Sequence, residues 1–362
     1  MLIRKFFLPL FAFLSIFTAT AQDKKFAIHT VAFYNVENLY DTINDPLTRD
    51  DEWVYSSKYY KRKISNVAKV LSMIGDGENP NPPTVIGLAE AENRRVLEAL
   101  VKEPNLMPFD YGIVHFDSPD RRGIDCAFLY QKSKFKPTSY VNIPLIIYES
   151  DTKKIDSSSA AKSDASDEEI EVDATNKRIY TRDQILMTGL LDGEEIHFIV
   201  NHWPSRRGGE KISSLLREKA AALNVKIIDS LRLLNPEAKV ITMGDLNDGP
   251  FNRSLKKVLK AKGDRKSLAP GDIYNPMENM AKKGIGTLAY RDAWDLFDQI
   301  LVTESLVRDD YKSYRFWKAG VYNKPFMIQT TGQYKGYGLR NNATSPGYSD
   351  HFPSYIYLIK QK

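Results

Sequence analysis

The sequence predicts a mixed α/β sandwich that forms one domain. Segments typical of strands recur along the chain, many of them alternating between apolar and mixed character, and segments with helical apolar spacing separate several of them. A length of 362 residues is enough to bury a sizeable core. The 42% of hydrophobic residues, the 20 Gly and the 18 Pro exclude a collagen, a coiled coil and a mostly disordered chain. One cysteine excludes a disulfide scaffold, and a net charge of +5 is too small alone to indicate a nucleic-acid-binding protein.

The first 21 residues predict a secretory signal peptide. Arg4 and Lys5 precede an apolar run that is too short for a membrane span of roughly 20 residues, and the Ala-Thr-Ala of 19–21 offers a cleavage site. A retained N-terminal anchor is the alternative, whereas a lipoprotein anchor is excluded because no cysteine follows the run. We therefore expect a secreted or periplasmic monomer, with a single domain over 22–362 and no stable membrane insertion after cleavage.

Strands and helices are expected to alternate along the mature chain. An apolar strand opens it at 26–34, and the next segment, 59–74, has the apolar spacing of a helix at Ile64, Val67 and Leu71. Further runs rich in β-branched and apolar residues, bounded by turn residues, indicate strands. These strands are expected at 85–90, 111–116, 123–130, 185–191, 196–201, 239–245, 296–303 and 352–360, with helices at 93–101 and 212–233.

The segment at about 149–176 interrupts this pattern. It is rich in Ser, Ala, Asp, Glu and Lys and has almost no apolar residues to bury. A segment of this composition predicts a mobile insertion between two strands, and its simplest interpretation is a solvated loop.

Polar residues stand where the predicted strands end. They are Asn35 and Glu37, Glu90, Asn201 and His202, Asp245 and Asn247, Asp298, and Asp350 and His351. Taken singly, Asn35 or Asp245 could cap a turn or helix, and either histidine could be a hydrogen-bonded structural residue. Loops at one edge of an α/β sheet converge, however, so the repetition predicts that these side chains meet in one site.

The chemistry of this group is coherent. Five carboxylates, with Asn35 and Asn247 as neutral oxygen donors, offer hard oxygen ligands, which favour Mg²⁺, Mn²⁺ or Ca²⁺ over zinc. Clustered carboxylates repel one another unless a cation neutralises them. Two histidines beside such a metal suit in-line attack on a phosphorus ester, one as base or charge stabiliser for the attacking water and the other at the leaving oxygen.

The order of these motifs resembles the endonuclease/exonuclease/phosphatase superfamily, whose members share the fold of pancreatic deoxyribonuclease I. The resemblance covers nearly the whole mature chain and implies a four-layer sandwich of two packed mixed β-sheets flanked by helices. It also implies a metal-dependent hydrolase acting on phosphate esters. The matching stretches are YNVEN (34–38), GLAEAEN (87–93), RRGIDCAFLY (121–130), TRDQ (181–184), NHWPSRRGG (201–209), GDLND (244–248), WDLFDQIL (294–301) and SDHFPSY (349–355).

The resemblance implies a set of metal ligands. Glu90 matches the family's metal-ligand glutamate, and Asn35 and Asp350 are expected to help to hold the metal or its waters. Glu37 lies where some members carry a carboxylate. Ala89 stands where many members have Gln, which would loosen the support of the ligand without removing it.

The resemblance also implies catalytic roles. Asp245 and Asn247 match the pair that orients the nucleophilic water and contacts the phosphate, and Asp298 matches the aspartate that polarises His351. His202 matches the histidine that contacts the phosphate and can assist the leaving group.

Three arginines are candidates for contact with the substrate. Arg182 resembles a family arginine that contacts the phosphate or supports the site. Arg206 and Arg207 could clamp a phosphate, because the two glycines after them permit close approach of the backbone, although a solvated surface turn is the alternative.

The function expected from the sequence is that of an exported phosphoesterase that hydrolyses phosphodiester bonds. Nucleic acid is the favoured substrate, cleaved by endonuclease or exonuclease action, because DNA and RNA are abundant polyanions outside the cell. A phosphatase or phosphodiesterase acting on sugar, inositol or lipid head-group phosphates is the alternative. A non-catalytic binding protein would show a gap in the acidic and histidine set, and the sequence has none.

Overall fold

The computed structural model describes residues 25–50, 55–151 and 172–362. The predicted signal peptide lies outside these residues, as does most of the predicted insertion, since 152–171 are not among them. Each of the strands and helices expected from the sequence is present, with ends shifted by a few residues.

The described residues form two six-stranded sheets that pack face to face. In each sheet the central pair is parallel, β1 with β2 and β9 with β10, and the other neighbouring pairs are antiparallel. The first sheet is ordered β15 (Arg315–Val321), β16 (Ser354–Gln361), β1 (Phe26–Leu39), β2 (Val85–Ala91), β4 (Asp125–Gln131), β3 (Tyr111–His115). The second sheet is ordered β11 (Ile273–Tyr274), β14 (Asp298–Thr303), β10 (Val240–Asp245), β9 (Glu194–His202), β8 (Gln184–Leu191), β5 (Phe135–Ile143).

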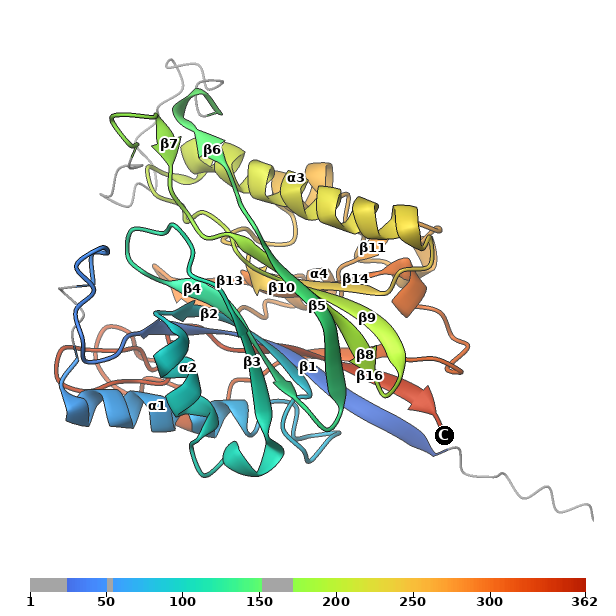
Figure 1. Cartoon of the computed structure of the whole chain (residues 1–362), viewed down its shortest axis with the longest axis horizontal. Coiled ribbons are helices and arrows are strands. Elements are labelled where there is room, and N and C mark those ends of the chain that lie inside the picture. The colour runs from blue at the N-terminus through green and yellow to red at the C-terminus, as the bar shows by residue number, and fades with distance from the viewer. Residues whose placement is uncertain (1–24, 51–54, 152–171) are drawn as a thin grey trace, which may run out of the picture.

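Helices cover the outer faces of the two sheets. Figure 1 shows α3 along one side of the molecule and α1 and α2 along the other, with the sheets between them. The helices are α1 (Ser57–Leu71), α2 (Arg94–Val101), α3 (Glu210–Leu234) and α4 (Met277–Ala281). Two short ribbons complete the fold, one of β6 (Ile147–Tyr148) and β7 (Arg178–Ile179) and one of β12 (Leu288–Tyr290) and β13 (Ala293–Asp295). None of the described helices is long and apolar enough to cross a membrane.

Side chains of the central strands point alternately to the two faces of each sheet, so each sheet packs against the other sheet on one face and against helices on the other. In β1, Val31 and Phe33 enter the core between the sheets, whereas Ala32 and Tyr34 pack with the residues of α1 and α2. Successive side chains of a strand point to opposite faces, so a strand covered on both sides is apolar at consecutive positions. A third core lies between the second sheet and α3. The four-layer sandwich of two mixed sheets flanked by helices is therefore confirmed.

A partly buried ionic cluster joins the two sheets at the end of the sandwich where β9 begins. The Glu194 carboxylate accepts hydrogen bonds from the Lys239 ammonium at 2.8 Å and the Ser313 hydroxyl at 2.6 Å, and it pairs with Lys360 of β16 at 2.5 Å. Although burial acts in the opposite direction, Lys239, Lys360 and Ser313 hold the pKa of Glu194 at about 2. The cluster ties the second sheet to the first.

Replacing Glu194 by glutamine is expected to lower the free energy of unfolding at pH 7 by about 2 kcal/mol. The depressed pKa of Glu194 alone would predict a somewhat larger loss of free energy of unfolding. Burial also lowers the pKa of Lys239, however, and this offsets part of the stabilisation. A carboxyl with a depressed pKa stabilises the fold above its unfolded value, so the difference should fade as the pH drops from about 4.5 towards about 2. Urea unfolding at pH 7 and pH 3 measures both. Glu195→Gln, at an exposed neighbour, is the control, and equal destabilisation by the two variants would contradict the prediction.

Candidate active site

Asp245 lies at the centre of the predicted site. It ends β10, and its Oδ2 accepts a hydrogen bond from Asn35 Nδ2 of β1 at 3.0 Å. The same oxygen lies 3.6 Å from His202 Nε2 and 3.8 Å from His351 Nε2. Strand register explains the convergence, because Asp245 pairs with His202 on β9 and with Asp298 on β14. One carboxylate oxygen thus gathers groups from both sheets.

His351 is held as a charged imidazolium. Its Nδ1 lies 2.7 Å from Asp298 Oδ2, and both side chains are buried. Burial disfavours the charge, but Asp298 and Asp245 outweigh it and raise the pKa of His351 well above its usual value. The Nδ1–H therefore donates to Asp298, which leaves Nε2–H directed at Asp245.

His202 has the opposite protonation. Burial, together with the nearby Arg182 and Arg122, lowers the pKa of His202 well below its usual value, so the ring is neutral at pH 7. Its Nε2 lies 3.9 Å from Glu90 Oε1, and its buried Nδ1 has no hydrogen-bond partner among the described residues. The site therefore contains one neutral and one charged histidine on either side of Asp245.

The backbone around the site is strained. The backbone is in the left-handed region, which residues other than glycine rarely adopt, at Glu37, Asn38, Glu90 and Asn247, with φ between 49° and 66°. Such residues cost free energy, and they cluster at functional sites where the surrounding fold holds them. Here the strain directs the Glu90 carboxylate towards the cluster, where it accepts the Asn38 N–H at 2.9 Å.

Asn247 supports the central aspartate through its backbone. Its N–H donates to Asp245 Oδ1 at 3.0 Å, while its side-chain amide donates to the Trp203 carbonyl at 2.9 Å. The amide thus lies at the cluster with part of its hydrogen-bonding capacity already used.

The donor set fits a hard divalent cation. Burial raises the pKa of Asp245 to about 6; His351 opposes this effect and Asp298 adds to it. Ligand atoms of Asp245, Asp298 and His351 lie within 4.8 Å of one another. Asp298 and His351 are committed to their own hydrogen bond, so the oxygens of Glu90, Asp245 and Asn35 are the better ligands. All are the hard donors that alkaline-earth cations prefer.

Glu37 and Asp350 lie to one side of this group. Both Glu37 carboxylate oxygens accept the backbone N–H of Asn341, at 2.9 and 3.1 Å. Burial and the neighbouring Asp350 raise the pKa of Glu37 to about 8. Asp350 accepts a hydrogen bond from Arg340 at 3.1 Å and lies 4.0 Å from His351 Nε2. Asp350 therefore borders the cluster, whereas the Glu37 carboxylate is bound to the 341 backbone.

The three candidate arginines are placed differently from one another. Arg182 is buried and donates to the carbonyls of His202 and Trp203 and to Asp120 at 2.8 Å. Its N–H groups therefore hold the backbone that carries His202. Arg206 donates to the Asn247 carbonyl at 3.0 Å and stacks over Phe297.

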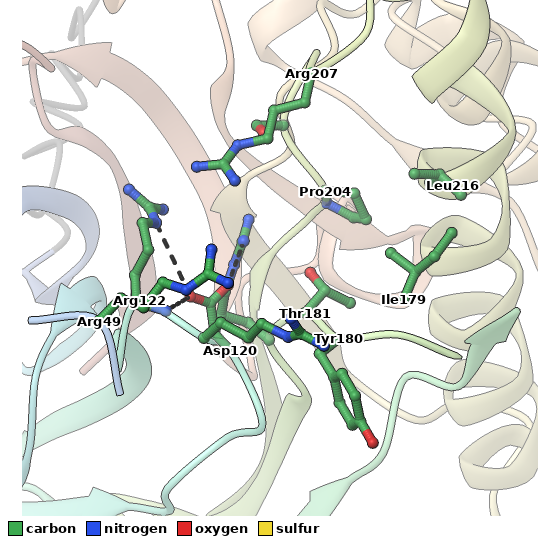
Figure 2. A pocket seen from close by; sticks show the side chains of 12 residues that line it. Arg49, Asp120, Arg122, Ile179, Tyr180, Thr181, Pro204, Arg207 and Leu216 are labelled. Carbon is green, nitrogen blue, oxygen red and sulfur yellow. Dashed lines mark hydrogen bonds and ion pairs between the residues drawn. The ribbon is translucent and has the colours of Figure 1, made fainter. Parts of the chain in front are cut away.

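Arg207 lines a pocket beside the cluster, together with Arg122 (Figure 2). Arg122 lies 3.7 Å from Glu90 Oε1 and was not among the residues selected from the sequence. The sequence could have indicated Arg122, because it belongs to a basic pair in the RRGID stretch that directly precedes the predicted strand at 123–130.

Two facing mixed sheets thus present, at one edge, a buried carboxylate close to two histidines, and the family to which the chain is similar accounts for this arrangement. A family model described as "Endonuclease/Exonuclease/phosphatase family" matches residues 30–159 and 147–360. The chain belongs to this family, as its motifs predicted. It is therefore a hydrolase that acts on phosphate esters, in a family whose enzymes use divalent metals.

Solved structures show the same fold at low sequence identity. TDP2 of D. rerio, complexed with a single-strand DNA product, matches with a TM-score of 0.51 and 14% identity over 92% of this chain and 99% of that one. Truncated TDP2 of Caenorhabditis elegans gives 0.53 and 15% over 91% and 97%. A mannosyl-6-phosphatase of Bacteroides thetaiotaomicron gives 0.51 and 16% over 91% and 99%. A search of curated proteins finds no match.

Proposed function

We propose that the protein is an exported, Mg²⁺-dependent phosphodiesterase whose substrate is nucleic acid, and thus a nuclease. The observation that carries the proposal is that the Nε2 atoms of His202 and His351 both lie within reach of one oxygen of Asp245, at 3.6 and 3.8 Å. Arginines beside the cluster favour a substrate with several negative charges. TDP2 of D. rerio, with its single-strand DNA product, supports nucleic acid as a substrate that this fold can hold.

The residues of the cluster divide the work of hydrolysis. Glu90, Asn35 and Asp245 are the residues that would hold a divalent ion, which would supply charge stabilisation at the phosphate when bound. Asp245, fixed by its hydrogen bonds from Asn35 and Asn247, accepts a proton as the water oxygen bonds to phosphorus. His351 gives its Nε2 proton to the ester oxygen as the phosphorus–oxygen bond breaks. The products are a phosphomonoester and an alcohol, and exchange with solvent restores both protonation states.

Glu90→Gln is expected to raise the Mg²⁺ concentration for half-maximal hydrolysis about 10- to 100-fold, because one ligand loses its charge. Titration of Mg²⁺ against hydrolysis of bis-p-nitrophenyl phosphate measures this, and excess EDTA should stop the wild-type reaction. Glu98→Gln, at an exposed carboxylate on α2, is the matched control. A titration curve identical to that of the wild type would remove Glu90 from the ligand set.

A substrate panel tests nucleic acid against the alternative. Plasmid DNA, RNA, sphingomyelin, inositol phosphates and sugar phosphates are each incubated with the pure mature protein, with Mg²⁺ and with EDTA. Cleavage of DNA or RNA, detected on gels, is expected, and release of phosphate from small esters alone would identify a phosphatase instead. Fractionation of the producing cells tests export. N-terminal sequencing tests cleavage of the signal peptide, and the mature chain is expected to begin at Gln22.

A further inference from the structure

The long helix that covers the second sheet carries a buried arginine. Arg217 lies on α3 (Figure 1), and the exposed fraction of its side chain is 0%. Its Nε lies 2.6 Å from Oδ1 of Asp248, which is also buried. Removing two charges from water offsets much of the attraction between them, so a buried ion pair is a weak source of stability. The position of this pair in the fold indicates a different role.

Arg217 joins the two loops that follow the central parallel strands of the second sheet. Asp248 belongs to the loop after β10. In the loop after β9, the carbonyls of Pro204 and Ser205 accept hydrogen bonds from Arg217 Nη1 at 3.4 and 3.3 Å. The same nitrogen donates to Ser213 Oγ of α3 at 2.9 Å. A guanidinium presents its N–H groups in a rigid planar fork, so one side chain can fix both loops to the helix.

The contacts of Arg217 lead directly to the centre of the site. Asp248 follows Asn247, whose backbone N–H donates to Oδ1 of Asp245 at 3.0 Å. The Asn247 side chain also bridges the two loops, since its Nδ2 donates to the Trp203 carbonyl at 2.9 Å. Arg217 is therefore linked to the central aspartate through Asp248 and Asn247.

The backbone of Asn247 needs support from its surroundings. Its φ is 49°, and a left-handed conformation of this kind persists only where the surrounding structure imposes it. The next residue, Asp248, is held at three points. Oδ1 binds Arg217, and Oδ2 accepts a hydrogen bond from the Ser254 hydroxyl at 2.6 Å. Its carbonyl accepts one from Gln299 Nε2 at 2.7 Å. Arg217 supplies the charged contact among the three.

We propose that Arg217 is a positioning residue that keeps Asn247 in its left-handed conformation and so directs the Asn247 N–H at Asp245. The proposal rests on the phosphoesterase function proposed above, and it adds a residue outside the catalytic cluster on which turnover depends. Lysine at this position would keep the charge but would present it as a single point on a flexible stem. Arg217→Lys therefore removes the fork that joins the loops and leaves the charge of the pair in place.

Hydrogen exchange tests the positioning without any substrate. In metal-free buffer, the amides of 203–207 and 245–249 should exchange about tenfold faster in Arg217→Lys than in the wild type, because the two loops open more easily. The strand segments 196–201 and 240–244 should keep their protection. Mass spectrometry of peptides measures both. Unchanged exchange in the two loops would refute the proposal, and faster exchange throughout α3 and β10 would show that Arg217 serves the fold as a whole.

Arg217→Lys should also lower kcat about 100-fold, because a displacement of about 1 Å at the reacting groups is enough for such a loss. KM should change less than about threefold, since the residue acts on the reacting groups and not on substrate binding. The substrate is an ester that the wild type hydrolyses in the panel above, and the temperature is one at which each variant is fully folded.

Arg315→Lys is the matched control. Arg315 is also buried and binds a carboxylate, that of Asp310, through two N–H groups. It lies on β15 opposite Ile359, near the far end of β16 from His351. This variant should lose stability but keep kcat. An equal loss of kcat in the two arginine variants would overturn the proposal.

Asp248→Asn tests the link from its other side. The change breaks the same ion pair, so kcat should fall to a similar degree, and combining it with Arg217→Lys should add little further loss. Additive losses would show that the two residues act separately and would contradict the proposed link. If no ester in the panel is hydrolysed, the proposed function fails, whereas the exchange measurement still decides whether Arg217 holds the two loops.

Discussion

Asp245→Asn is expected to lower kcat for bis-p-nitrophenyl phosphate about 1,000-fold, since it removes the proton acceptor and a metal-facing charge. The amide retains the shape of the side chain and can still accept a hydrogen bond from Asn35, so the variant should fold. Burial raises the pKa of Asp245 to about 6, above its usual value. A carboxyl with a raised pKa contributes stability below its unfolded value and loses it as the pH rises through about 6. In EDTA at pH 8 the variant should therefore unfold at or above the wild-type temperature.

The control for this variant is Asp229→Asn, at an exposed carboxylate on α3. It should leave both kcat and the unfolding temperature unchanged. Wild-type turnover by the Asp245 variant would remove Asp245 from the mechanism, and a large drop in its unfolding temperature would show that the residue serves the fold instead.

His351→Asn should lower kcat by a factor of about 10² to 10⁴, the range typical of a lost general acid. Asp298→Asn should have a comparable effect although Asp298 lies behind the histidine, because the imidazolium would lose the carboxylate that holds its Nδ1–H. Residues that act as a unit are strongly non-additive, so the double variant should be no slower than the slower single variant.

Steady-state kinetics of the two single variants and the double variant measure this coupling. His197→Asn is the matched control, because His197 is also buried and hydrogen-bonded, to Thr188, but stands near the other end of β9. Additive losses from the two single changes would show that the histidine and the aspartate act separately.

The sequence predicts the centre of each sheet better than its edges. Central strands are covered on both faces and therefore read as apolar runs, which is why β1, β2, β9 and β10 are predictable. Three edge strands, β5, β11 and β15, were not predicted. Most side chains of β5 are not buried, and it contains Pro137, which is compatible with an edge strand because no ladder hydrogen bond is needed on the outer side.

The candidate site was predictable in composition but not in orientation. Asp245 and His202 end two parallel strands, and His351 precedes β16, which runs antiparallel to β1, so their positions at strand ends indicate that the three meet at one edge. The left-handed backbone at Glu37 is not visible in the sequence, and with it the Glu37 carboxylate binds Asn341, 304 residues away. The ion pair of Arg182 with Asp120 joins residues 62 positions apart, so the sequence leaves open whether Arg182 contacts the phosphate or supports the site, and the structure shows the contacts of a support.

The pairing of β1 with β16 has a consequence for how activity is acquired. Phe26 lies opposite Gln361, so the first described strand is completed only by the last one. The site takes Asn35 from the former and His351 from the turn that leads into the latter. A chain emerging from the ribosome therefore lacks His351 until nearly all of it has been synthesised. The topology delays assembly of the site until synthesis is almost complete, so a partly made chain cannot act on the phosphate esters around it.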